Sequence, residues 1–143
     1  MKLIKINTKH TAEDVKNLDL TNIQIDMMKR VFDNIEYVEF IDKKGFASIF
    51  CITSDYNLKR LADLYISLSV SFSITDLTKN VLLSDKVETS YEDEDGIDVS
   101  SSITKLVNGF YKDYITVNDV LDKINIKGIL SLNKFDRLVL ENV

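Results

Sequence analysis

The sequence predicts an α+β fold in which an antiparallel sheet is followed by a helical extension. Segments with strand-like and helix-like apolar periodicity follow one another in the order β-α-β-β-α-β between residues 2 and 75. A run of acidic residues comes next, and the chain beyond residue 98 has helical periodicity alone. The element order is typical of the ferredoxin-like fold, in which a four-stranded antiparallel sheet carries two helices on one face.

The N-terminal segment supplies the first strand and the first helix. KLIKIN, residues 2–7, alternates between apolar and polar side chains and is expected to form a strand. Residues 11–18 suit a short helical turn. Thr21 suits an N-cap, because Gln24 stands three residues later and completes a capping box. A helix over residues 22–33 follows from one apolar stripe, made of Ile23, Met27, Met28, Val31 and Phe32.

A hairpin and a second helix–strand pair complete the predicted sheet. Residues 35–41 and 46–52 are rich in β-forming side chains, and the turn between them places Gly45 at a left-handed position. Because the second of these strands is apolar on both faces, it is expected at the centre of the sheet, covered on both sides. Residues 70–75 alternate as the fourth strand. Ser54 can cap the intervening helix, whose stripe is Leu58, Leu61, Ala62, Tyr65 and Ile66.

The C-terminal third is predicted to be helical. The predicted organisation is an α+β sheet domain over residues 1–84, an acidic linker over 85–98 and a helical extension over 99–143. Because 45 residues barely support a core of their own, the extension is expected to pack against the first part, on the free face of its sheet. Its first helix starts at a serine cap and carries a stripe of Ile103, Leu106, Val107, Phe110 and Tyr111.

Two further helices are predicted at the C-terminus. Thr116 can cap one and Ser131 the other. The segment from Val120 to Asn142 resembles a short tail at the ends of various bacterial proteins, in which a helix containing L-D-K-I is followed by glycine, S-L and a second small helix. The resemblance implies a helix-turn-helix and no activity. The side chains expected to face inward are Val117, Val120, Leu121, Ile124, Leu132, Phe135, Leu138 and Val139.

Composition bounds the setting of the protein. The 143 residues contain one cysteine, so no disulfide can form within the chain, and a reducing, cytoplasmic location is the simplest interpretation. No apolar run is long enough to span a membrane, and the first ten residues lack the apolar core of a signal peptide. Lysine outnumbers arginine 15 to 3, a bias typical of AT-rich bacteria and many of their phages.

The acidic run is the most distinctive feature of the sequence. Residues 85–98 have a net charge of −6, so the rest of the chain is nearly neutral. A self-repelling solvated linker, a docking element for a basic protein surface and a weak calcium site made of Asp93, Asp95 and Asp98 are the three interpretations. An EF-hand loop aligned on Gly96 lacks its first and twelfth ligands, so no metal site is predicted. The candidate partner-binding residues are Glu92, Asp93, Glu94, Asp95 and Asp98.

The sequence offers few candidates for catalysis. Cys51 and His10 could form a nucleophile–base pair, but Cys51 lies in the middle of an apolar strand, where thiols are usually buried and inert. No two glycines are spaced as in a phosphate-binding loop, so no nucleotide cofactor is predicted. Glu36 and Glu39 fall on opposite faces of one strand, which argues against an acid–base pair. No catalytic residue is therefore assigned.

Nucleic-acid binding is a further alternative, because some ferredoxin-like sheets bind RNA through aromatic side chains. Phe46 and Phe50 would supply rings on one strand, but the first strand has none and the chain has no basic surround. The sequence thus argues against nucleic acid. We expect a small non-enzymatic protein that acts through protein contacts, as an adaptor, an inhibitor or a subunit of a larger assembly. Its partner would be another protein or a second copy of this chain. The alternative is a small enzyme using Cys51 and His10.

Overall fold

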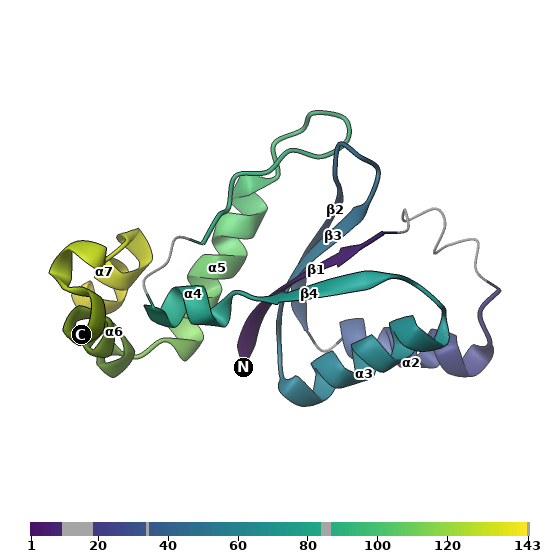
Figure 1. Ribbon diagram of the computed structural model, residues 1–143, viewed down its shortest axis with the longest axis horizontal. Helices are drawn as coiled ribbons and strands as arrows, with labels where there is room; N and C mark the ends of the chain where they lie inside the picture. Colours follow the sequence, from purple (N-terminus) through teal and green to yellow (C-terminus); the bar gives the residue numbers. More distant parts are fainter. Residues whose placement is uncertain (10–18, 34, 84–86, 143) are drawn as a thin grey trace.

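The computed structural model describes residues 1–9, 19–33, 35–83 and 87–142, which form an α+β fold (Figure 1). Their four strands make one open antiparallel sheet in the order β2-β3-β1-β4. The α+β class is therefore confirmed. The helical turn expected at residues 11–18 lies outside the described residues. The strands are β1 (Lys2–Thr8), β2 (Glu36–Ile41), β3 (Ala47–Thr53) and β4 (Phe72–Asp76).

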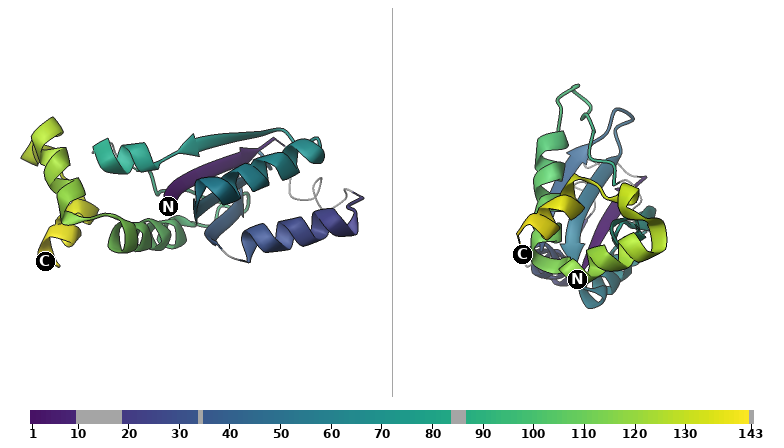
Figure 2. Two further views of the ribbon diagram at one scale, coloured as in Figure 1. Left: turned by 90° about the horizontal axis from the view of Figure 1, so that it is seen from below. Right: turned by 90° about the vertical axis from the view of Figure 1, so that its left-hand side faces the viewer.

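Helices lie on both faces of this sheet, and the C-terminal helices lie beyond one end of it (Figures 1 and 2). Two helices lie on one face, α2 (Asn22–Phe32) and α3 (Asp55–Ser67), and α5 (Ser100–Tyr114) lies on the other. A short helix follows directly after β4. The remaining helical elements are α4 (Thr78–Leu83), α6 (Val117–Lys127), the 3-10 turn η1 (Ile129–Ser131) and α7 (Lys134–Glu141). No helix among the described residues is both long and apolar enough to cross a membrane.

The central strand β3 divides the core into two clusters. All seven of its residues are buried, which confirms the prediction of a strand covered on both sides. Ile49 and Cys51 face α2 and α3, and pack with Ile4 and Ile6 of β1. Side chains of the opposite parity face α5, and the cluster on that side contains Leu3, Phe50, Ile52, Ile103, Leu106, Val107 and Phe110.

Helix caps agree with the sequence at three positions and differ at two. Capping boxes at Thr21–Gln24 and Thr116–Asp119 are present, and Ser54 caps α3. The serine cap expected for α5 is absent: the helix begins at Ser100 itself. The cap of α7 is Asn133 rather than Ser131. The side-chain oxygen of Asn133 accepts from the N–H groups of Phe135 and Asp136, and the Asn133 N–H donates to the Asp136 carboxylate.

Two fully buried charges join α6 to α7. Lys123 Nζ donates to the Asp136 carboxylate at 2.5 Å, and the two side chains are 1% and 0% exposed. The second Asp136 oxygen accepts from the Asn133 N–H at 3.0 Å, and the Lys123 ammonium lies 5.6 Å from the centre of the Tyr111 ring. Both charges are therefore paired and hydrogen-bonded, the condition under which buried charges are tolerated.

Several apolar residues expected in helix stripes face solvent. Ile23 is 74% exposed, Ile66 66% and Leu121 45%. The buried face of each of the helices α2, α3 and α6 is therefore narrower than the apolar periodicity predicts. The division of the chain into units 1–84, 85–98 and 99–143 stays a prediction.

Candidate functional site

The acidic residues fold into a tight turn, here called the acidic turn (residues 92–98). Its two sides are linked by a β-bridge between Glu92 and Asp98, and the Asp93 N–H donates to the Ile97 carbonyl at 2.9 Å. At the apex, the Asp93 carboxylate accepts from the N–H groups of Asp95 and Ile97, both at 2.9 Å. The N–H groups of Asp93, Asp95 and Ile97 are thus satisfied within the turn.

The β2–β3 turn has the same hydrogen-bond pattern as the acidic turn. The Asp42 carboxylate accepts from the N–H groups two and four residues later, again at 2.9 Å. In both turns a glycine follows three residues after the aspartate, and its N–H donates to the aspartate carbonyl. Gly45 has φ 84° and Gly96 has φ 77°, so the left-handed position predicted for Gly45 is confirmed.

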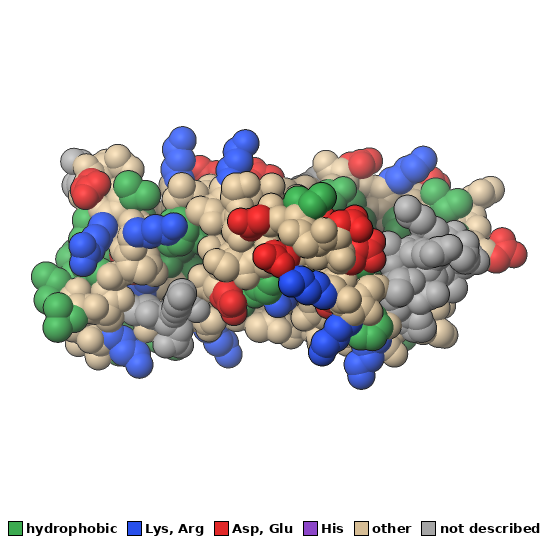
Figure 3. Space-filling view, turned by 90° about the horizontal axis from the view of Figure 1, so that it is seen from above, with side chains coloured by type: hydrophobic (Ala, Val, Ile, Leu, Met, Phe, Trp, Pro, Cys, Tyr) green, Lys and Arg blue, Asp and Glu red, His purple; other side chains and the backbone are tan. Residues whose placement is uncertain are grey.

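These two turns lie side by side and are bonded to each other (Figure 1). The Glu94 N–H donates to the Ile41 carbonyl at 2.8 Å, and Lys43 Nζ lies 2.7 Å from the Glu92 carboxylate. The acidic turn is thus fixed to the end of the sheet. Figure 3 views the molecule from this side and shows acidic side chains gathered near the middle of the visible face.

The five predicted partner-binding carboxylates divide into two groups. Three of them hold local structure, since Asp93 closes the turn, Glu92 pairs with Lys43, and Asp98 accepts from the Ser100 N–H at 2.8 Å. The hydroxyl and the N–H of Ser100 lower the pKa of Asp98. Among the described residues, the carboxylates of Glu94 and Asp95 have no hydrogen-bond or ion-pair partner, and Ile97 beside them is 61% exposed. No group of three or more His, Cys, Asp or Glu side chains placed to hold a metal ion occurs within this part of the chain.

A second exposed surface lies where α6 meets η1. Ile126, Ile129 and Leu130 are 66%, 67% and 96% exposed there, and we call them the aliphatic corner. Gly128, with φ 85°, turns the chain between them. Exposed hydrophobic side chains are visible at the α6–α7 end of the molecule in Figure 3. The helix-turn-helix was predicted, and none of these three residues was among the side chains expected to face inward, but no exposed apolar surface was predicted here.

Cys51 lies in the core and is fully buried. Burial raises the pKa of its thiol to about 12, so the thiol is protonated at neutral pH and is a weak nucleophile there. His10 lies outside the described residues. Of the proposed Cys51–His10 pair, the structure therefore describes Cys51 alone, and its buried, protonated thiol is poorly suited to act as a nucleophile.

The aromatic residues considered for RNA stacking are not on a free surface. Phe50 is completely buried beneath α5, where it packs with Phe40 and Tyr91. Lys5 lies 5.4 Å from the centre of the Phe50 ring and 4.6 Å from that of Tyr91. Phe46 is 38% exposed at the end of the hairpin. A single half-exposed ring gives no stacking platform of the kind that RNA-binding sheets use.

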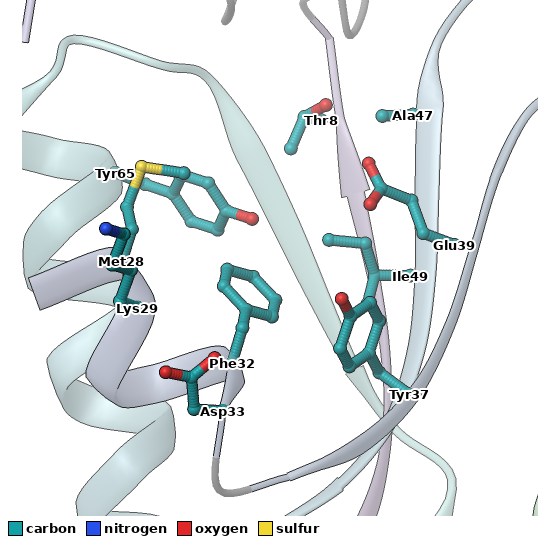
Figure 4. Close-up of a pocket in the computed structure, with 10 residues that line it drawn as sticks. All are labelled: Thr8, Met28, Lys29, Phe32, Asp33, Tyr37, Glu39, Ala47, Ile49 and Tyr65. Atoms are coloured by element: carbon teal, nitrogen blue, oxygen red, sulfur yellow. The ribbon is translucent and has the colours of Figure 1, made fainter. Parts of the chain in front are cut away.

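A cavity of about 360 Å³ lies between α2 and the sheet (Figure 4). Its apolar lining comes from Met28, Ala47 and Ile49, and three aromatic side chains border it, namely Phe32, Tyr37 and Tyr65. Phe32 and Tyr37 meet edge to face, with ring centres 5.3 Å apart. The volume falls within the range of small-molecule sites, although no sequence motif predicted such a site.

Polar side chains line this cavity on several sides, namely Thr8, Lys29, Asp33, Tyr37, Glu39 and Tyr65. The Tyr65 hydroxyl and the Glu39 carboxylate both point into the space between α2 and the sheet (Figure 4). Burial, and then the Glu39 charge, raise the pKa of Tyr65. Glu36 borders a different hollow, against α5, so the prediction that Glu36 and Glu39 occupy opposite faces is confirmed.

No protein-family model matches this chain, and comparisons with curated proteins and with solved structures found no significant match.

Proposed function

We propose that this chain is a small non-enzymatic protein that acts by binding another protein. The aliphatic corner carries the proposal. Three neighbouring aliphatic side chains, each at least 66% exposed, cost free energy in water unless a partner covers them. The partner's matching surface would be an apolar cleft with acidic groups at its edge, because Lys127 stands exposed beside the corner.

The acidic turn supplies a second, charged contact in this proposal. Glu94 and Asp95 project from a turn that is anchored to the sheet, so little conformational entropy is lost when a partner binds them. Their charges would steer a basic protein surface, and Ile97 would add apolar contact. Glu92, Asp93 and Asp98 would act by holding the turn in shape.

The ferredoxin-like assignment is also part of the proposal. The β-α-β-β-α-β order of the described elements up to β4 and the strand order β2-β3-β1-β4 support it. In this fold, α2 and α3 occupy one face of the sheet, and α5 would be an addition that covers the other.

The test compares partner capture by the wild-type chain and by Ile129→Ser/Leu130→Ser. Both side chains are exposed, so the substitutions should leave the unfolding free energy within about 0.5 kcal/mol of wild type. Capture from a lysate of the encoding organism should fall about tenfold or more. The matched control is Ile66→Ser, which removes an equally exposed isoleucine from α3 and should capture as wild type does.

Two further readouts locate the contact. A native mass above 16.4 kDa that returns to the monomer value in the double variant would identify a second copy as the partner. Zero-length carboxylate–lysine cross-linking should join Glu94 or Asp95 to the partner, and Glu94→Gln/Asp95→Asn should remove that product. Equal capture by the wild type and the corner variant would reject the aliphatic corner as the docking surface.

A further inference from the structure

We propose that the cavity between α2 and the sheet binds a small organic cation, a methylated or quaternary ammonium group. This inference is independent of the protein-binding proposal, because the cavity lies on the sheet face opposite α5 and shares no residue with the aliphatic corner or the acidic turn. Three features of the lining support it: the aromatic rings, the balance of charge and one buried hydroxyl.

The rings supply the first feature. Phe32, Tyr37 and Tyr65 border one cavity, and the faces of aromatic rings carry partial negative charge that attracts cations. Since Phe32 and Tyr37 meet at an interplanar angle of 63°, their faces form two differently oriented walls. The thioether of Met28 and the side chains of Ala47 and Ile49 add apolar surface to the wall of the cavity. A methylated ammonium, which is weakly hydrated, loses least on entering such a site.

The charge balance supplies the second feature. Among the described lining residues, two carboxylates, Glu39 and Asp33, face one ammonium, Lys29. The net charge of these groups is negative, so the lining favours a cation over an anion or a neutral molecule. Glu39 is an exposed residue of β2, and Figure 4 shows its carboxylate turned toward the cavity.

The Tyr65 hydroxyl supplies the third feature. Tyr65 is 5% exposed, and within the described residues no hydrogen-bond partner lies in range of its hydroxyl, which points into the cavity. Buried polar groups without a partner are rare, because each loses its hydrogen bonds to water. A ligand whose hydroxyl or amide lies beside the ammonium group would pair with Tyr65 while the positive charge faces Glu39.

Choline and its neutral carbon isostere, 3,3-dimethylbutan-1-ol, test the assignment directly. Titration of the full chain, followed by amide shifts in NMR spectra, should show choline binding at α2 and β2, with the isostere at least about tenfold weaker. Glu39→Gln should weaken choline binding about tenfold, whereas Glu36→Gln, on the same strand but the opposite face, should leave it unchanged. Tyr65→Phe should weaken choline and spare tetramethylammonium, which has no hydroxyl.

Several outcomes would overturn the proposal. They are equal affinity for choline and the isostere, equal effects of Glu39→Gln and Glu36→Gln, or no amide shift at millimolar choline. Because a quaternary ammonium occurs both free and on lipid head groups, a parallel arm uses phosphatidylcholine vesicles. Co-sedimentation that depends on Glu39 assigns the site to a lipid head group, and choline binding without co-sedimentation assigns it to a free cation.

Discussion

Cys51 shows how its position in the sheet determines the chemistry open to a single side chain. The thiol lies on β3 and packs with Ile4 and Ile6 of β1, and burial raises its pKa to about 12. A catalytic thiol needs the opposite environment, one that stabilises the thiolate. The same raised pKa makes stability depend on pH at the alkaline end.

We expect the stability of the wild-type chain, relative to Cys51→Ala, to fall as the pH rises above about 9. The unfolded chain then releases its thiol proton at the ordinary pKa of 9.0, while the folded thiol keeps its proton until about pH 12. The free energy of unfolding should therefore lose up to about 1.4 kcal/mol for each pH unit in this window. Urea denaturation of both proteins across the window measures the difference, and a difference that stays constant with pH would contradict the assignment.

The α6–α7 pair illustrates what holds two short helices together at the scale of the element. Each is too short to be stable alone, and the buried Lys123–Asp136 pair crosses between them. Asp136 also completes the capping box of α7, so one carboxylate serves both the helix end and the interface between the two helices.

Lys123→Met should destabilise the protein by about 3–5 kcal/mol, because it leaves the Asp136 charge buried without a partner. The double variant Lys123→Met/Asp136→Asn should recover most of this loss, since an amide oxygen at position 136 can still accept from the Asn133 N–H. Urea denaturation of the two variants provides the measurement. A single variant within about 1 kcal/mol of wild type would show that the pair contributes little.

The elements themselves were largely predictable, whereas the sites were not. Apolar periodicity located each strand and the five longer helices, because burial of one face imposes that spacing on the sequence. From the sequence alone, Lys123 would be expected on the surface, because its burial depends on a partner on a different helix, Asp136. The cavity beside Glu39 is lined by residues from five elements, and no pattern within a short stretch of sequence can predict that they come together.

The described part of the molecule is organised around a sheet that carries helices on both faces. The α5 helix packs over Phe50 and Ile52 on one side, while α2 and α3 cover Ile4 and Cys51 on the other. The acidic turn, predicted as part of a linker, is bonded to the β2–β3 turn, so it belongs to the same packed body.

A chain shortened to residues 1–98 should lose cooperative unfolding, because removal of α5 exposes the apolar face of β3 to water. The matched control is residues 1–116, which retains α5 and lacks only α6, η1 and α7. We expect the control to unfold cooperatively at a lower temperature than the full chain in circular dichroism. If residues 1–98 unfold with the midpoint of the full chain, the sheet is an independent domain.

The bonded pair of turns also limits how the sequence can change. Surface loops ordinarily tolerate insertions, because their tips contact little else. Here the Ile41 carbonyl accepts from the Glu94 amide, 53 residues away, and the Lys43 ammonium pairs with the Glu92 carboxylate, 49 residues away. An insertion in either turn would break its bonds to the other turn. We therefore expect the lengths of the two turns to change together, if they change at all.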